Sequence, residues 1–224
     1  HQNIRSANRN IDEFKMFLDT LNMKFTVIVL TETWLTPDLS WIDLPGYVTF
    51  HSVRTNGRGG GVAILVSENI KCSAIGDLTQ SGSILESCSV LLDIGNKKYM
   101  IAGIYRPPTA SIGEFNGRLS EMFGTRSLKW NCIFAGDFNV DIGNTSSGSA
   151  SSIFVENFKA MGFLPVITLP TRVTVQTSSI IDHIWTNWLG DAYSGVFQLG
   201  ITDHFPVFAV VPHVFRKGTQ MVDV

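Results

Sequence analysis

Acidic, amide and histidine side chains repeatedly follow apolar runs of this sequence, at the points where strands are expected to end. Asp137 and Asn139 come directly after the run 132–135, within the stretch NCIFAGDFNVDIG. Loops cluster and ligands bind at strand ends, so a repeated placement of this kind favours one shared site. The other residues in such positions are Asn3, Glu32, Tyr105, Asp203 and His204.

These residue types suit the cleavage of a phosphodiester bond with the help of a metal ion. Mg²⁺ prefers oxygen ligands and keeps several waters, so one or two carboxylates and an amide oxygen suffice, and Glu32 and Asn3 could supply them. Hydrolysis also needs a positioned water, charge neutralisation on the phosphoryl oxygens and help for the leaving oxygen. Asp182, on a strand expected beside His204, is placed to fix the orientation and tautomer of that histidine.

Each of these side chains, taken alone, also has a purely structural explanation. Glu32 could cap a turn, and Asp137 and Asn139 could hydrogen-bond to their own backbone. Asp182 could pair with His183 or with an arginine. One residue therefore carries little weight, and the prediction of a site rests on the whole set.

Composition and charge narrow the class of protein. The 224 residues are 44% hydrophobic and 16% charged, which is typical of one large compact domain. With 17 basic and 19 acidic side chains the net charge is -2, which argues against a protein that holds nucleic acid mainly through a basic surface. If the substrate is a polyanion, a divalent cation held by carboxylates would offset its charge.

The sequence also gives expectations about location. Cys72, Cys88 and Cys132 form no CxxC pair and have no nearby histidine partner, which argues against disulfides or a zinc site and fits a reducing compartment. No apolar run reaches the roughly 18 residues that span a bilayer, and the N-terminal stretch HQNIRSANRN lacks a signal-peptide core, so no membrane segment is expected. The polar start at His1, without Met, suggests a segment of a longer polypeptide.

Hydrophobic periodicity predicts more strands than helices. Because hairpins alternate with helical crossovers, we expect an α/β fold with mixed sheets, in one domain over 1–212 with a C-terminal tail or linker at 213–224. Helical spacing occurs in 10–22, 111–123 and 151–162. Strands are expected in 24–33, 62–67, 87–94, 97–108, 132–135, 178–187 and 193–211, with a hairpin through GNKK at 95–98.

The acidic stretch itself has an expected geometry. Gly136 should let the backbone turn tightly after the buried strand. Asp137 and Asn139 would then face the same side at strand spacing, while Phe138 packs on the other side. Asp141 is expected to be a loop residue or turn former.

The ordered motifs of the chain resemble the exonuclease, endonuclease and phosphatase superfamily. They span nearly the whole sequence, from Asn3 to about Val211. Within that superfamily, NIRS, TETWL, GGGVAI, YRPP and IDHI look most like the apurinic-type endonuclease domain of non-LTR (LINE) retrotransposons. The motifs are NIRS at Asn3, TETWL at Glu32, IYRPP at Tyr105, GDFN at Asp137 and Asn139, SSIIDHI at Asp182, and TDHFPV at Asp203 and His204.

This resemblance implies a fold and an activity. The fold is a four-layer α/β sandwich of the DNase I type, in which two mixed sheets pack face to face with helices outside. The activity is a Mg²⁺-dependent nick, with Mn²⁺ as a substitute, in one strand of double-stranded DNA. The 3'-hydroxyl would prime reverse transcription by a reverse transcriptase domain of the same polyprotein. The isolated domain would be monomeric, made in the cytoplasm and active in the nucleus.

The resemblance also implies roles for the residues that match its motifs. Glu32 would be the principal metal ligand, with Asn3 close to the metal and Asp203 as a further ligand or an aid to the leaving group. Asp137 would position or deprotonate the attacking water. Asn139 would orient the phosphate or that aspartate.

Three further residues complete the implied site. His204, held by Asp182, would donate to a non-bridging phosphate oxygen, or act as general base in an alternative scheme. Tyr105 would contact the phosphate near the leaving oxygen. Both one-metal and two-metal schemes remain open.

The segment TRVTVQTSS at 171–179 resembles a hairpin that, in LINE endonucleases, enters the minor groove and senses DNA shape. Arginines outside this hairpin are candidates for phosphate contacts, with a solvated surface position as the alternative. The expected DNA-binding residues are Arg172, Thr174, Gln176 and Ser178 of the hairpin, and Arg106 and Arg58 elsewhere.

One departure from the family and two other functions are kept open. Only His1 and Gln2 precede Asn3, so the family's first strand is missing or very short, and Asn3 is expected to fray. The same fold could serve an abasic-site repair nuclease or another phosphodiesterase, such as one for phospholipids or inositol phosphates. It could also serve as a non-catalytic DNA-binding module, although such a copy should have lost one of the site residues.

Overall fold

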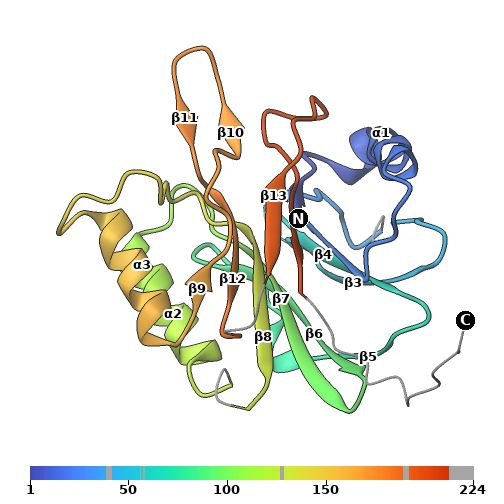
Figure 1. The fold of residues 1–224 in the computed structure, drawn as a ribbon, viewed down its shortest axis with the longest axis horizontal. Coiled ribbons are helices and arrows are strands. Elements are labelled where there is room, and N and C mark those ends of the chain that lie inside the picture. Colours follow the sequence, from blue (N-terminus) through green and yellow to red (C-terminus); the bar gives the residue numbers. More distant parts are fainter. Residues whose placement is uncertain (39–41, 56, 58, 127–128, 189–191, 212–224) are drawn as a thin grey trace, which may run out of the picture.

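In the computed structural model, residues 1–38, 42–55, 57, 59–126, 129–188 and 192–211 are described. Their main elements are two stacked sheets with helices on the outer faces (Figure 1). Arg58 and the expected tail 213–224 lie outside the described residues. Within the described ranges, no helix combines the length and apolar character needed to cross a bilayer.

The first sheet has four strands and is mixed. Its order is β1-β2-β4-β3, with β1 parallel to β2 and the other pairs antiparallel. β-Branched and leucine side chains dominate its two central strands, as expected for strands covered on both faces. The strands are β1 (Gln2–Asn3), β2 (Val27–Thr31), β3 (Tyr47–Ser52) and β4 (Val62–Ser67).

The second sheet has six strands in the order β5-β6-β7-β8-β12-β9. β7 and β8 are parallel and the other neighbours are antiparallel. Two hairpins, β10–β11 and β13–β14, form separate two-stranded sheets. The bounds are β5 (Lys71–Ala74), β6 (Glu86–Ile94), β7 (Lys97–Tyr105), β8 (Asn131–Asp137), β9 (Leu164–Pro165), β10 (Arg172–Val173), β11 (Ser178–Ser179), β12 (Asp182–Thr186), β13 (Tyr193–Val196) and β14 (Val207–Val210).

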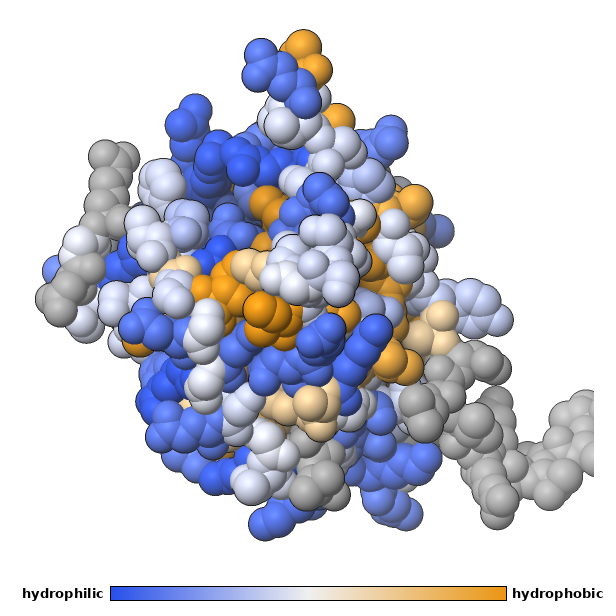
Figure 2. All heavy atoms as spheres, turned by 90° about the vertical axis from the view of Figure 1, so that its left-hand side faces the viewer, coloured by the Kyte–Doolittle hydropathy of each residue, from blue (hydrophilic) through white to orange (hydrophobic). Residues whose placement is uncertain are grey.

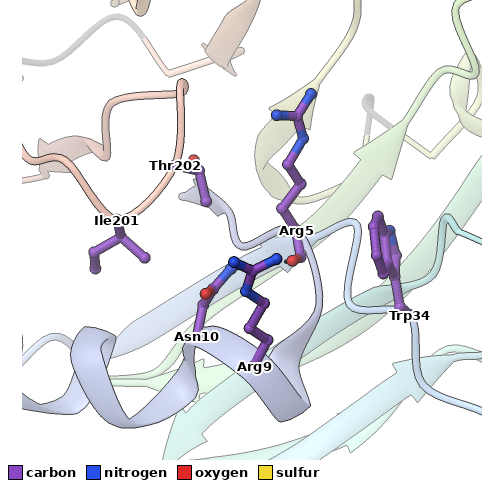
Figure 3. Close-up of a pocket in the computed structure, with 6 residues that line it drawn as sticks. All are labelled: Arg5, Arg9, Asn10, Trp34, Ile201 and Thr202. Atoms are coloured by element: carbon purple, nitrogen blue, oxygen red, sulfur yellow. Dashed lines mark hydrogen bonds between the residues drawn. The ribbon is translucent and has the colours of Figure 1, made fainter.

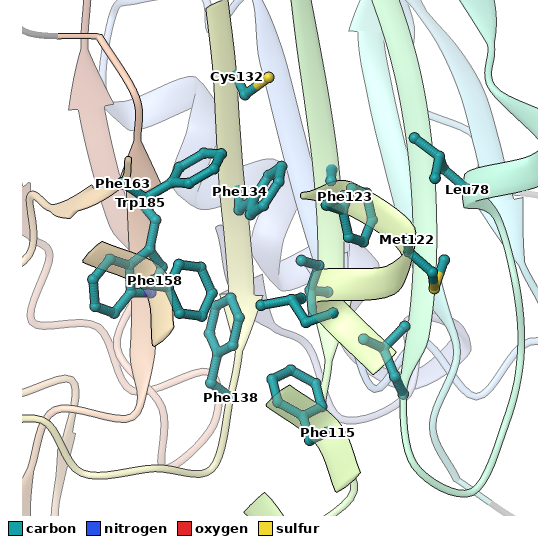
Figure 4. Close-up of a cluster of buried hydrophobic side chains, with 14 of the residues drawn as sticks. Leu78, Phe115, Met122, Phe123, Cys132, Phe134, Phe138, Phe158, Phe163 and Trp185 are labelled. Carbon is teal, nitrogen blue, oxygen red and sulfur yellow. The ribbon is translucent and has the colours of Figure 1, made fainter. Parts of the chain in front are cut away.

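Helices close the sandwich on both sides. α1 (Ala7–Thr20) packs on the outer face of the first sheet, while α2 (Ile112–Phe123) and α3 (Ala150–Ala160) pack on the outer face of the second (Figure 1). A short 3₁₀ helix, η1 (Gly76–Leu78), follows β5. The α2–α3 layer is rich in aromatic rings, several of which are labelled in Figure 4.

Alternation along the strands divides the apolar side chains between these layers. In β2, Val29 points between the sheets, whereas Ile28 and Leu30 pack toward α1. In β8, Ala135 faces the other sheet and Phe134 faces α2 and α3. Helix, sheet, sheet and helices therefore form four layers, and the α/β sandwich expected from the sequence is confirmed.

Some elements differ from the sequence-based expectation. Segment 193–211 was expected to be one strand but forms the hairpin β13–β14, because residues 197–206 between its strands form a long connection. The strands β3 and β5 were not predicted. β1 is very short, as expected, but Asn3 is not frayed: it pairs with β2, opposite Thr31, and is 3% exposed.

Gly136 also has a different structural reason from the one expected. It lies within β8, opposite Ile104 of β7, and a Cβ added there would be 1.7 Å from the Ile104 carbonyl oxygen. The glycine is therefore required by close approach of two backbones, and the turn comes later, at Asn139, whose φ is 49°.

We predict that Gly136→Ala prevents folding or lowers the free energy of unfolding by more than about 4 kcal/mol, because the overlap involves rigid backbone atoms. Gly117→Ala in α2 is the matched control, since a Cβ there meets nothing within 4 Å. The control should be neutral or up to about 1 kcal/mol more stable. Urea denaturation of both variants measures the difference, and similar midpoints would contradict this explanation.

Candidate active site

Strand register alone brings three of the expected site residues together at one edge of the second sheet. Asp137 is the last residue of β8, and it is paired with Tyr105 of β7 on one side and with Asp182 of β12 on the other. Asn3 and Glu32 come from the first sheet, at the ends of β1 and β2. The site therefore lies where corresponding ends of both sheets meet.

Asp137, Asp182 and His204 form a compact buried group. His204 Nδ1 lies 2.9 Å from Asp182 Oδ2 and 4.0 Å from Asp137 Oδ2. One potential metal-ligating atom from each residue lies within 4.8 Å of the others. The histidine is thus held by one carboxylate and faces a second, as the sequence predicted for the Asp182–His204 pair.

Burial and mutual repulsion control the protons in this group. Burial, followed by the negative charge of Asp182, raises the pKa of Asp137 to about 7. For His204, burial opposes the charged form, but the charge and hydrogen bond of Asp182 outweigh it and raise the pKa. Near neutral pH, His204 is therefore favoured as a donor and Asp137 as a group that can accept or release a proton.

One amide side chain and one backbone N–H orient Asp137. Asn3 Nδ2 donates to Asp137 Oδ2 at 2.9 Å, and the backbone N–H of Asn139 donates to Asp137 Oδ1 at 3.0 Å. Asn139 was expected to share a strand face with Asp137, but its positive φ ends the strand, and its Nδ2 donates to the Arg106 carbonyl instead. The alternative explanation, that Asp137 hydrogen-bonds to nearby backbone, is therefore also observed. The same side chain contacts Asn3 and lies near His204 as well.

Glu32 is held in a bend that follows β2. Its φ is 53°, and its Oε2 accepts hydrogen bonds from the Trp34 indole N–H and, at 3.2 Å, from the Gly60 N–H. The Tyr105 hydroxyl is also hydrogen-bonded to Glu32, and burial together with this bond raises the pKa of Tyr105. Glu32 is therefore linked to the second sheet through Tyr105.

The glycine-rich loop that contacts Glu32 is itself anchored by a buried ion pair. Glu86 is 0% exposed, accepts from Arg54 Nε at 2.6 Å and from the Gly61 N–H at 2.5 Å. Burial raises the pKa of Glu86, and the bonds from Gly61 and Arg54 partly offset this. Gly60 is adjacent to Gly61 in this loop, so the Glu86–Arg54 ion pair also holds the Gly60 N–H that donates to Glu32.

Asp203 lies beside the compact group and is paired with two arginines. Its Oδ1 is 2.8 Å from Arg5 Nη1, and its Oδ2 accepts from Arg172 Nε at 2.8 Å. Burial alone would raise the pKa of Asp203, but Arg172, His204 and Arg5 together lower it. The Arg172 guanidinium therefore joins the β10–β11 hairpin to the site. The direct DNA contact expected of Arg172 stays a prediction.

The phosphate contact expected for Arg106 is wrong, because the side chain is buried. It is 4% exposed and donates to four backbone carbonyl oxygens. These belong to Phe138 at 2.7 Å, Asn139 at 2.7 Å, Pro107 at 3.3 Å and Ala110. Its guanidinium cannot face a DNA phosphate and instead fixes the turn after Asp137.

Replacing Arg106 should therefore damage the fold and the site rather than DNA binding. We predict that Arg106→Gln lowers the free energy of unfolding by about 3 kcal/mol, because several buried carbonyls lose their partner. Arg118→Gln on the exposed face of α2 is the control, with an expected effect within about 0.5 kcal/mol. If the Arg106 variant keeps wild-type stability and only loses DNA affinity, the original phosphate-contact expectation is restored.

The remaining expected DNA-binding residues lie on the β10–β11 hairpin, which projects from the body of the molecule (Figure 1, Figure 2). Thr174, Gln176 and Ser178 are exposed. The tip is closed by the Thr174 N–H, which donates to the Thr177 carbonyl at 2.8 Å, and Val175 at the tip is fully exposed. An exposed polar and apolar tip on a short ribbon is compatible with insertion into a groove.

The donor set fits a hard divalent cation. Asp182 Oδ1 is buried and accepts no hydrogen bond from the described residues, with His1 Nδ1 at 3.7 Å. Carboxylates of Asp137 and Glu32 and the amide oxygen of Asn3 add further oxygen atoms. Glu32 and Asp203, two of the three expected ligands, lie outside the compact group of Asp137, Asp182 and His204.

Several supporting residues were missed from the sequence. Trp34 and Gly60 contact Glu32, and Arg5 contacts Asp203. Trp34 stands two residues after Glu32 inside TETWL, so the motif itself contained a signal. Glu86 was also detectable, as an isolated acid at the start of a strongly apolar strand.

Comparison with known proteins places this geometry in a family. The pattern of the endonuclease/exonuclease/phosphatase family matches residues 2–204, which covers most of the chain. The chain belongs to this family. The superfamily resemblance drawn from the motifs is thereby confirmed, and no curated protein matches the chain significantly.

Several solved structures share the fold at low sequence identity. The endonuclease domain of TRAS1, a telomere-specific non-LTR retrotransposon, has a TM-score of 0.75 at 14% identity over 93% of this chain and 95% of that one. The catalytic domain of Xenopus laevis APE2 has a TM-score of 0.67 at 18% identity, over 93% of this chain and 89% of that one. The 3' phosphatase NExo from Neisseria, bound to a product DNA hairpin, has a TM-score of 0.66 at 16% identity, over 94% of this chain and 97% of that one.

Proposed function

We propose that this chain is a Mg²⁺-dependent DNA endonuclease that nicks one strand of double-stranded DNA. The observation that carries the proposal is the buried Asp137–Asp182–His204 group, oriented by Asn3 and adjoining the Glu32–Tyr105 pair. Paired carboxylates, a fixed histidine and a tyrosine are the groups that phosphodiester hydrolysis uses.

The side chains divide the work according to their contacts. Asp137, whose oxygens are fixed by Asn3 and Asn139, positions the attacking water and accepts its proton. His204, kept protonated by Asp182, donates to a non-bridging oxygen of the phosphate and stabilises the charge that develops there.

The other groups serve the leaving side of the phosphate. Tyr105 stays neutral because burial raises its pKa, and its hydroxyl would donate a hydrogen bond to the leaving oxygen in place of the bond to Glu32. Glu32, Asn3 and Asp203 would hold the Mg²⁺ ion, although Asp203 must share its carboxylate with Arg5 or Arg172. When bound, the ion neutralises phosphate charge and stabilises the leaving oxygen; Mn²⁺ has the same ligand preference and could substitute.

We further propose that the nick primes reverse transcription of a LINE element. The support is the motif context of TETWL and YRPP, together with the fold shared with the TRAS1 endonuclease domain. On this proposal a reverse transcriptase domain belongs to the same polyprotein, which is made in the cytoplasm and acts in the nucleus. Residues 1–212 would be the endonuclease domain, monomeric when isolated, and 213–224 a linker.

The preferred DNA substrate separates this proposal from abasic-site repair. The experiment compares nicking of an intact supercoiled plasmid with cleavage of an oligonucleotide duplex that carries one abasic site, at equal concentrations of scissile sites. Comparable rates on both substrates are expected. A strong preference for the abasic site would favour repair, and binding without cleavage of either substrate would favour the non-catalytic module.

A further inference from the structure

A small cavity adjoins the candidate active site on the side of α1. Its volume is about 230 Å³, and Figure 3 shows that its lining residues come from the β1–α1 bend, the first turn of α1, the bend after β2 and the loop before Asp203. The lining contains two guanidinium groups and one indole, and no acidic side chain. The lining residues are Arg5, Arg9, Asn10, Trp34, Ile201 and Thr202.

A constrained backbone bend presents Arg5 to this cavity. Arg5 and Ser6 have φ values of 45° and 85°, which are uncommon for residues other than glycine. Asn10 holds the bend, because its Nδ2 donates to the carbonyl oxygens of Ile4 at 2.7 Å and Arg5 at 3.0 Å. Arg5 therefore bridges two places, since it lines the cavity and also pairs with Asp203.

Arg9 is the second cation of the cavity, and its charge is not neutralised by a neighbour. It is exposed in the first turn of α1, where the positive end of the helix dipole makes a cation unfavourable. Within the part of the chain that the structure describes, its guanidinium has no hydrogen bond or ion pair. An anion placed between Arg5 and Arg9 would relieve this repulsion.

Trp34 forms the opposite wall. Its indole N–H donates to Glu32, which fixes the ring, and Figure 3 shows the ring edge-on, with one face turned toward the two arginines. An aromatic face beside positive charges is the combination that binds a base together with its phosphate. The wall is shared with the candidate site, because Trp34 contacts Glu32 and Arg5 contacts Asp203.

We infer that this cavity is a subsite for one nucleotide of the DNA strand that flanks the cleaved bond. The phosphate lies between Arg5 and Arg9, and the base or sugar lies against Trp34. The cavity is smaller than the 300 Å³ or so that small-molecule sites usually begin at, which favours part of a polymer over a free cofactor. The inference rests on the proposed DNA nuclease function, and it adds a place where the strand is held.

The test measures DNA affinity in EDTA, so that binding is observed without cleavage. The probe is a fluorescent duplex of about one and a half helical turns, titrated at several salt concentrations. Arg9→Ala should weaken binding about tenfold, as for the loss of one charge-assisted hydrogen bond, and should reduce the slope of log K against log salt by about 0.9. Arg126→Ala is the matched control, because Arg126 precedes β8, at the opposite end of that strand from Asp137.

Single neutral methylphosphonates, moved one position at a time along the strand, identify the phosphate itself. One position should weaken binding to the wild-type protein but have no further effect on Arg9→Ala. A pair of Trp34 variants tests the ring: Trp34→Leu and Trp34→Phe both lose the N–H bond to Glu32, and only Phe keeps a flat face. The Leu variant should bind about tenfold more weakly than the Phe variant.

The possible outcomes separate this inference from the proposed function. If the wild-type protein binds and nicks DNA but Arg9→Ala behaves like Arg126→Ala, the subsite is wrong and the nuclease proposal stands. If every methylphosphonate affects wild type and Arg9→Ala equally, Arg9 contributes only general charge and the subsite is also wrong. If the wild-type protein neither binds nor nicks DNA, both proposals fail.

Discussion

Asp137→Asn should reduce DNA nicking by at least about 10³-fold, the largest effect expected from a single substitution in this protein. The carboxylate is buried at the end of β8, contacts Asn3 and Asn139 through its two oxygens, and lies 4.0 Å from His204. Asparagine has the same shape but cannot accept the proton of a water molecule. The Asn3 amide can flip, which keeps a hydrogen bond to the new side chain.

The folding control for this variant follows from the raised pKa of Asp137. In the folded, metal-free protein the carboxyl group keeps its proton up to about pH 7, whereas the unfolded chain loses it near pH 3.8. The wild-type free energy of unfolding should therefore fall as the pH rises from about 4 to about 7, and this fall should be smaller in Asp137→Asn. Urea melts in EDTA at several pH values measure it. If Asp137→Asn nicked DNA at the wild-type rate, the proposed role of Asp137 as proton acceptor would be contradicted.

His204→Ala should reduce nicking by about 10²- to 10³-fold, and Asp182→Asn should have a similar effect. The reason is that the two residues act as a unit: Asp182 Oδ2 holds His204 Nδ1 at 2.9 Å and favours its charged form. The double variant should be hardly worse than either single variant, because the second change removes nothing that still functions.

The pH profile distinguishes a catalytic histidine from a structural one. Because the pKa of His204 is raised above 6.5, the proton is lost, and nicking should decline, on the alkaline side of that value. Loss of the Asp137 proton near pH 7 should limit the acid side. His204→Ala should retain the acid limb and lose the alkaline one in its residual activity. The proposal that His204 and Asp182 act as a unit would be contradicted if the effects of His204→Ala and Asp182→Asn were fully additive. It would also be contradicted if the pH profile of His204→Ala were the same as that of the wild type.

Much of the site was predictable because it depends on where strands end. Locating the ends of two apolar runs placed Tyr105 and Asp137 at the site, and strand register aligns them on adjacent strands. Asp182, which was expected inside its strand, is aligned with Asp137 by the same register. The layers were predictable for a similar reason, since buried strands with helical crossovers permit few arrangements. The pairing of Asp182 with His204 followed from residue type and neighbouring strands.

The parts that failed depend on contacts between segments far apart in the sequence. Arg106 was expected on the surface, but its guanidinium donates to the carbonyls of Phe138 and Asn139, which are 32 and 33 residues away, and no local pattern reports that. Arg172 lies 31 residues from its partner Asp203, so its ion pair was equally invisible. Gly136 was assigned to a turn. Its actual role could not be seen in the sequence, because the Ile104 carbonyl comes close to it only in the folded sheet.

The hydrogen bonds to Glu32 were also not predictable from the sequence, although the residues that make them lie in recognised motifs. Trp34 was within the motif, yet nothing in the spacing indicated that its indole N–H donates to the Glu32 carboxylate. The glycine-rich loop was recognised as a break between strands. Its function as a support for Glu32 through Gly60, itself anchored by Glu86 next to Gly61, needed the three-dimensional structure.

The central claim is that this site makes a metal-dependent nick with an extendable end. The most direct measurement treats supercoiled plasmid with the wild-type protein in Mg²⁺ or in EDTA, then adds a DNA polymerase and labelled nucleotides. We predict nicked circles in Mg²⁺ alone, labelled without any prior removal of a 3'-phosphate. Nicking that persists in EDTA, or ends that the polymerase extends only after phosphatase treatment, would contradict the account.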